Sequence, residues 1–116
     1  MVEDDELIRH ATAAVLQADN FVVAEAADAL QAMSILGSRD DIAVVFTDVD
    51  LPGRVNGEAL AQMLVRQAPW ISVVVTSGAH PPGRIGFGFL AKPYRADVML
   101  RLIRRAAEQA QRSQDF

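Results

Sequence analysis

The 116-residue chain has no cysteine, a single lysine and no surplus of basic residues. Without cysteine it can form no disulfide, no thiolate metal cluster and no cysteine nucleophile. Fifteen acidic side chains against eleven basic ones give a formal charge of −4, which argues against direct nucleic-acid binding, since such proteins normally carry a basic face. No apolar run approaches the ~20 residues of a membrane span, and the acidic start is the reverse of a secretion signal. We therefore expect a cytoplasmic protein with no membrane partner, folded as one domain over residues 1–116.

The chain alternates short apolar runs with longer amphipathic stretches. The apolar runs predict strands at residues 21–24, 42–46, 71–75 and 86–90. The amphipathic stretches predict helices at residues 6–18, 28–36, 56–66 and 95–110. Asp4 or Asp5 can cap the first helix, Asn56 the third, and Gly37 can end the second in a left-handed conformation. Strands separated by crossover helices predict an α/β fold with a parallel sheet flanked by helices.

Polar residues gather where the expected strands end or the first helix begins: Glu3, Asp4, Asp48, Asp50, Ser77 and Lys92. In an open α/β sheet these positions meet at one rim. Two carboxylates 4 Å apart repel by about 4 kcal/mol at an effective dielectric of 20, so three need a cation or protonation. Oxygen ligands without histidine or thiolate suit Mg²⁺. An aspartate beside such an ion can attack phosphorus, with Lys92 and Ser77 available to contact the phosphate oxygens.

Four segments resemble the ordered motifs of response-regulator receiver domains: Val-Glu-Asp-Asp-Glu-Leu-Ile-Arg, Thr-Asp-Val-Asp-Leu-Pro-Gly, Val-Thr-Ser-Gly and Phe-Leu-Ala-Lys-Pro-Tyr. Each motif alone is weak, but four in order cover nearly the whole chain. The resemblance implies a doubly wound, flavodoxin-like receiver fold. It also implies a phosphoprotein of two-component signal transduction or a phosphorelay, carrying an aspartyl phosphate.

The resemblance assigns roles to individual residues. It makes Asp48 the phosphoacceptor, while Ser77 binds a phosphoryl oxygen and Lys92 pairs with it. Phe89 falls where the family has its switch aromatic, and its rotation would follow the movement of Ser77. The implied Mg²⁺ ligands are Glu3 through water, Asp4 directly, Asp48, and Asp50 through its backbone carbonyl. The implied partners are a histidine kinase or phosphotransfer protein and an unidentified downstream protein.

Two departures from the family pattern stand out. Only Met1 and Val2 precede the acidic cluster, so the central first strand is truncated: upstream residues were lost, the strand is very short, or another chain fills the gap. We favour the first of these readings. Fourteen residues separate Ser77 from Lys92, which leaves room for a loop and not for the usual fourth helix.

The leading hypothesis is therefore a stand-alone receiver without an output domain, which is no enzyme beyond its own phosphorylation and dephosphorylation. The second is a receiver-like binding module that needs no phosphate. The third is a phosphatase, because Asp48-Val-Asp50 is similar to the nucleophile motif of haloacid-dehalogenase-type enzymes. That family has threonine where this chain has Pro52, which argues against it. The apolar stripe of the last helix is mostly core, with a surplus that a homodimer contact could cover: Val98, Met99, Leu102, Ile103 and Ala106.

Overall fold

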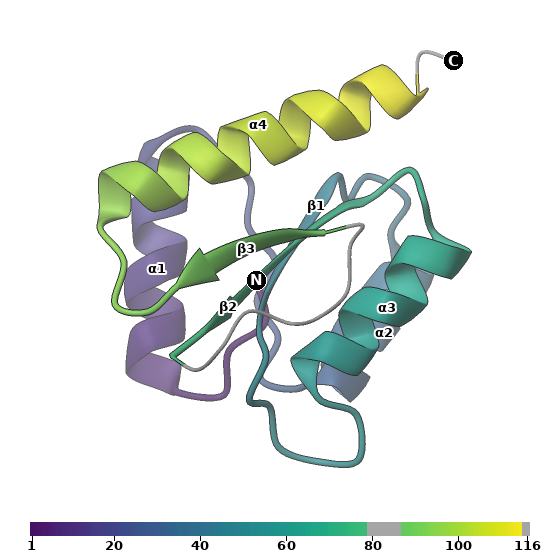
Figure 1. The fold of residues 1–116 in the computed structure, drawn as a ribbon, viewed down its shortest axis with the longest axis horizontal. Coiled ribbons are helices and arrows are strands. Elements are labelled where there is room, and N and C mark those ends of the chain that lie inside the picture. Colours follow the sequence, from purple (N-terminus) through teal and green to yellow (C-terminus); the bar gives the residue numbers. More distant parts are fainter. Residues whose placement is uncertain (79–86, 115–116) are drawn as a thin grey trace.

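A computed structural model describes residues 1–78 and 87–114 of the chain, with side chains up to residue 111. In chain order the elements are α1 (Glu6–Ala18), α2 (Ala29–Ser38), β1 (Val44–Asp48), α3 (Gly57–Gln67), β2 (Ser72–Ser77), β3 (Gly88–Ala91) and α4 (Ala96–Gln114), as drawn in Figure 1. None of the described helices is both long and apolar enough to cross a membrane.

The sheet is parallel and has the order β1-β2-β3 in the described part of the chain. Val45 lies opposite Val73, and Val75 lies opposite Phe89. Parallel strands need crossovers, and helix α3 makes the connection between β1 and β2. All three strands therefore end at the same rim of the sheet.

Two apolar cores cover the two faces of this sheet. Val45, Val73 and Val75 point to α2 and α3, where Leu60 and Leu64 of α3 are buried. The intervening residues face the other way, toward α1 and α4, in a second core of Leu16, Phe46, Val74, Leu90, Met99, Ile103 and Ala106. In Figure 1, α1 and α4 accordingly lie on one side of the strands and α2 and α3 on the other. This arrangement confirms the expected doubly wound α/β fold.

Short polar side chains fix the starts of α1 and α3. The Asp5 carboxylate accepts from the Ile8 amide at 3.1 Å, which confirms one of the two predicted caps of α1. The Asn56 side chain accepts from the Ala59 amide at 2.8 Å and confirms the cap of α3. Such bonds satisfy amides that have no partner within the helix.

The first strand is reduced to a single paired residue, Val2. Its amide donates to the Phe46 carbonyl at 2.8 Å, and its carbonyl accepts from the Asp48 amide at 3.0 Å. On the other side Val2 forms a parallel bridge with Ala26. Val2 is only 2% exposed. The truncated strand expected from the sequence thus occupies one position between β1 and residues 21–26.

The structure corrects two of the expectations from the sequence, and a third concerns residues that it does not describe. Residues 21–24 do not form a strand; the backbone bond to them from the first residues is the one that the Met1 amine donates to the Ala24 carbonyl, at 2.9 Å. Gly37 does not end α2 in a left-handed conformation; it lies within the helix, which continues to Ser38. The segment 79–86, where a loop was expected instead of the usual fourth helix, lies outside the described residues.

Candidate functional site

Asp48 is the last residue of β1, and its side chain is 8% exposed. Each carboxylate oxygen has a partner: Oδ2 lies 2.6 Å from the Lys92 Nζ, and Oδ1 accepts from the Asp50 amide at 3.0 Å. The Asp48 amide is bonded to Val2, so its backbone is held by the short first strand. The carboxylate is therefore oriented from three directions at the rim of the sheet.

The loop after Asp48 packs tightly under the start of α3. The Gly57 amide donates to the Val49 carbonyl at 2.8 Å. A Cβ atom added at Gly57 would lie 1.7 Å from the backbone oxygen of Asp48, a distance that no side chain permits. Glycine at this position lets the helix approach the strand end, which keeps Asp48 in place.

Glu3, Asp4 and Asp48 form an acidic cluster in which one carboxylate oxygen of each lies within 4.8 Å of the others. Glu3 is 3% exposed, whereas Asp4 is exposed. Burial, together with the neighbouring Asp4 and Asp48, raises the pKa of Glu3 from 4.5 to about 6. The second Glu3 oxygen, Oε2, is buried without a hydrogen-bond partner among the described residues. A buried acceptor without a partner normally costs about 1–3 kcal/mol.

This donor set fits a hard divalent cation. Three carboxylates from two parts of the chain can converge on one ion, and the unpartnered Glu3 Oε2 would gain a positive neighbour. Carboxylate oxygens without nitrogen or sulfur ligands match the preference of Mg²⁺. The residues present can therefore hold a metal ion at this rim, which is where the sequence placed it.

Lys92 directly follows β3 and Ser77 is the last residue of β2, so both lie at the same rim. The Lys92 amide donates to the Ser77 carbonyl at 2.9 Å. The Lys92 Nζ also lies 3.8 Å from Glu3 Oε1. Burial alone would lower the pKa of Lys92, but the hydrogen bond to Asp48 and the charges of Asp48 and Glu3 outweigh it and raise the pKa. Ser77 is 3% exposed at the end of β2.

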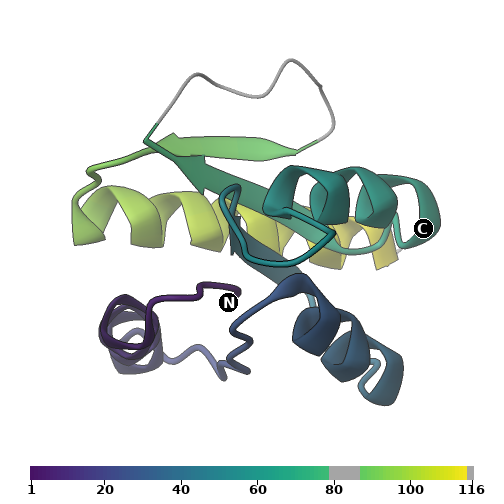
Figure 2. The same ribbon diagram turned by 90° about the horizontal axis from the view of Figure 1, so that it is seen from below.

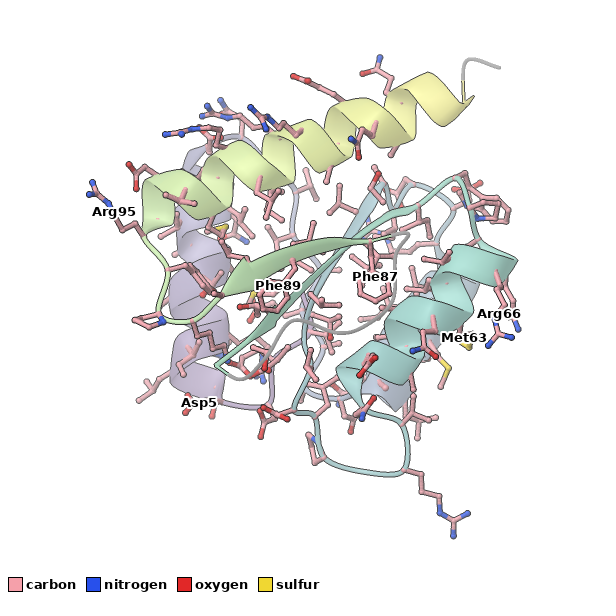
Figure 3. All side chains as sticks on the ribbon, in the orientation of Figure 1. Asp5, Met63, Arg66, Phe87, Phe89 and Arg95 are labelled. Atoms are coloured by element: carbon pink, nitrogen blue, oxygen red, sulfur yellow. The ribbon has the colours of Figure 1, made fainter. Side chains whose placement is uncertain are left out.

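Asp50 and Phe89 are not members of this acidic cluster. Asp50 is exposed, and its amide donates to the Asp48 carboxylate. The role of its carbonyl as a ligand stays a prediction. Phe89 is half-buried and packs with Phe87 against the core on the α3 side of the sheet, as Figure 3 shows. Its role as a switch also stays a prediction.

Sequence reasoning missed Arg9, which supports the acidic cluster from α1. The Arg9 Nη1 donates to the Glu3 carbonyl at 3.0 Å, and its Nε lies 3.3 Å from Glu25 Oε1. Its side chain is only 14% exposed. A cation near a helix N-terminus is unfavourable for the helix dipole unless it has partners elsewhere. The position of Arg9 near the start of α1 was therefore the signal in the sequence that this arginine has partners outside the helix.

A parallel sheet covered on both faces, with an acidic cluster and a lysine where its strands end, defines an α/β domain of the receiver type. The family model described as the response regulator receiver domain matches residues 1–104. The chain belongs to this family, whose members act in two-component systems.

Curated relatives extend the comparison. An NtrX-like response regulator of Rickettsia bellii is 28% identical over 93% of this chain and 24% of its own length. The C4-dicarboxylate transport transcriptional regulatory protein DctD of Rhizobium meliloti is 29% identical over 93% of this chain and 25% of its own length. The chain thus spans about a quarter of these two relatives. Among solved structures, the receiver domain of NtrX from Brucella abortus is 30% identical, with a TM-score of 0.80 over 92% of this chain and 95% of that one.

Proposed function

We propose that Asp48 accepts a phosphoryl group from the phosphohistidine of a histidine kinase or phosphotransfer protein. The observation that carries the proposal is the placement of a buried, oriented carboxylate between an acidic cluster and Lys92. Glu3, Asp4 and Asp48 would hold Mg²⁺. When bound, the ion would neutralise charge on the phosphoryl oxygens and on the carboxylates.

In the transfer step a carboxylate oxygen of Asp48 attacks phosphorus. A P–O bond forms as the P–N bond of the donor breaks, and the imidazole nitrogen keeps the electron pair and takes up a proton. Lys92, now 2.6 Å from Asp48 Oδ2, is close enough to follow the new negative charge onto a phosphoryl oxygen. Charge-assisted contacts of this kind contribute most where water is excluded.

The new charge would also change the packing around β3. In this proposal the Ser77 hydroxyl moves to donate to a phosphoryl oxygen, and Phe89 takes up a different position against the core. Such a local charge event, coupled to a packing change with two states, alters the surface that a downstream protein contacts. The half-buried state of Phe89 is consistent with a side chain that has a second position to occupy.

The direct test is incubation with acetyl phosphate and Mg²⁺ followed by intact-mass spectrometry. We expect one phosphoryl adduct, lost in Asp48→Asn and retained in the matched control Asp41→Asn, whose residue is exposed and paired with Arg39. A folded protein without an adduct would support the alternative, a receiver-like binding module independent of phosphate. An adduct that survives in Asp48→Asn would place the acceptor elsewhere.

A further inference from the structure

A small cavity lies beside the acidic cluster, on the face of the sheet that α1 and α4 cover. Its volume is about 10 Å³. A buried water needs a cavity of at least about 10–15 Å³, so there is room for one water molecule and no more. Three residues of the site line this cavity together with one further polar residue and two aromatic ones: Glu3, Asp48, Lys92, Thr76, Phe46 and Tyr94. We call it the rim cavity.

The register of the strands places Thr76 in one row with the acidic cluster. Thr76 of β2 lies opposite Asp48 of β1, and partners in a parallel pair turn their side chains to the same face. Val2 bridges Thr47, so Glu3 lies next to Asp48 on its other side. Figure 2 shows this order across the sheet, with β3, β2, β1 and then the first residues of the chain. Glu3 and Thr76 therefore flank Asp48, with Cα atoms about two strand spacings, or roughly 10 Å, apart.

Each of these flanking residues has a buried oxygen without a hydrogen-bond partner among the described residues: Glu3 Oε2 and Thr76 Oγ1. Glu3 is 3% exposed and Thr76 is 4% exposed. Among the side chains that the structure describes, these two oxygens are the only buried polar atoms without a partner. Buried polar atoms in native proteins almost always have a partner, which is either protein or an ordered water. Two exceptions that line the same cavity therefore indicate a shared partner.

The chemistry of the two oxygens defines that partner. A carboxylate oxygen can only accept hydrogen bonds, whereas a threonine hydroxyl can also donate one. The shared partner must therefore donate to Glu3 Oε2, and it can accept from Thr76 Oγ1. Asp48 lies between the two residues, but its carboxylate oxygens already contact Lys92 Nζ and the Asp50 amide. A water molecule both donates and accepts, and it matches the volume of the rim cavity.

We propose that the rim cavity binds one water molecule, which accepts a hydrogen bond from the Thr76 hydroxyl and donates one to Glu3 Oε2. Thr76 is then a positioning residue of the metal site, an inference that rests on the Mg²⁺ site of the proposed function. A carboxylate oxygen accepts at two lone pairs, so the water leaves one of them free for the ion. Because the Glu3 side chain is already held by the water, less side-chain freedom is lost when Mg²⁺ binds. Removing a residue that holds a metal ligand in this way typically weakens metal affinity by about 10–100-fold.

The test compares two substitutions at Thr76 by Mg²⁺ calorimetry. Thr76→Val removes the hydroxyl and keeps the branched shape that suits a strand, so the variant should fold. We expect it to bind Mg²⁺ about tenfold more weakly than the native chain. Thr76→Ser is the matched control, because it keeps the hydroxyl and loses only a methyl group, and it should bind Mg²⁺ nearly as tightly as the native chain. Equal affinity of Thr76→Val and the native chain would overturn the inference. A loss that serine does not rescue would also overturn it, since the methyl group and not the hydroxyl would then matter.

A crystal structure of the metal-free protein, at a resolution that shows ordered waters, provides an independent check. It should place one water within hydrogen-bond distance of both Thr76 Oγ1 and Glu3 Oε2, and that water should be lost in Thr76→Val. A direct bond between the two side chains, or a water that contacts only one of them, would overturn the proposal.

The outcomes also separate this inference from the proposed function. A native chain that binds no Mg²⁺ would overturn the metal site and the role of Thr76 together. A native chain that binds Mg²⁺ but does not respond to Thr76→Val would overturn the role of Thr76 alone. The assignment of Asp48 as phosphoacceptor depends on neither result, because it is tested by the loss of the phosphoryl adduct in Asp48→Asn.

Discussion

Replacing Lys92 by methionine tests whether this single cation compensates the acidic cluster. Lys92 Nζ lies 2.6 Å from Asp48 Oδ2 and 3.8 Å from Glu3 Oε1, and these two partner side chains are 8% and 4% exposed. Methionine keeps most of the length and apolar stem of lysine but carries no charge. The variant therefore leaves three converging carboxylates without the cation that now pairs with two of them, Asp48 and Glu3.

The expected loss follows from the burial of the pair. Breaking a buried ion pair by removing one partner costs about 3–5 kcal/mol. The Lys92 side chain is 31% exposed, so solvent screens part of this interaction. Because of this screening, we expect Lys92→Met to lower the free energy of unfolding by about 2–3 kcal/mol, less than for a fully buried pair, in the absence of divalent cations.

Mg²⁺ should restore much of the stability that Lys92→Met loses, because an ion bound to the acidic cluster replaces the missing positive charge. The ion should also bind the variant more tightly than the native chain, since the Lys92 ammonium no longer repels it. If the variant binds Mg²⁺ about tenfold more tightly than the native chain, saturating Mg²⁺ narrows the gap by about 1.4 kcal/mol. Urea unfolding in EDTA and in a Mg²⁺ series measures both quantities. Arg95→Met is the matched control, since Arg95 is 82% exposed and pairs with Asp97 at the surface, so its loss should change stability by less than about 0.5 kcal/mol.

Two results would refute the reasoning. If Lys92→Met lost the same stability with and without Mg²⁺, the lysine would matter through packing and not through charge. If the variant were as stable as the native chain in EDTA, the three carboxylates would not be electrostatically strained.

Three further predictions concern neighbouring groups. Burial raises the pKa of Glu3 from 4.5 to about 6, so the stability that Glu3 contributes is lost as the pH rises from 4.5 to about 6. Burial lowers the pKa of the Met1 ammonium from 8.0 to about 6, so the stability that Met1 contributes is lost as the pH falls from 8.0 to about 6. Urea unfolding without Mg²⁺ should therefore show a stability minimum near the shared value of about 6, on the order of 1–2 kcal/mol deep, and Glu3→Gln should flatten its acidic side. Gly57→Ala should lower stability by about 2–3 kcal/mol in thermal or urea unfolding, because its Cβ would meet backbone, whereas Gly37→Ala, a helical site with open space, should be neutral or stabilising. Arg9→Met should cost about 1–3 kcal/mol and weaken Mg²⁺ binding measured by calorimetry, since it releases the Glu3 carbonyl; an unchanged affinity would show that Arg9 does not position the cluster.

Local chemistry explains which parts of the fold were predictable. Asn56 and Asp5 cap helices through bonds that span three residues, so the sequence alone carries the signal. The apolar runs identified β1 and β2, although β1 extends to Asp48 because pairing with Thr76 continues past the apolar residues. The strand predicted at residues 21–24 failed because a strand requires a partner, and its partner has only one bridged residue, Val2. The β propensity of residues 21–24 is a property of that segment alone and does not show whether a partner strand lies beside it.

The site shows the same division. The convergence of Glu3, Asp4 and Asp48 followed from strand ends and motif order, and the structure brings their carboxylates together. The bond from Arg9 to the Glu3 carbonyl joins a side chain to the backbone, and the sequence does not record such contacts.

The position of Lys92 just beyond β3 has a consequence for behaviour on warming. In the described part of the sheet β1 and β3 are both terminal strands, but β3 has four residues and is paired on one side, whereas β1 has five residues and also bridges Val2 on its other side. Strands with fewer contacts open at lower free energy than better packed ones. Heating short of global unfolding would thus detach the ammonium while Asp48 stays fixed, and the rim would become more negative. The attraction of the domain for divalent ions should grow with temperature until the interior itself gives way.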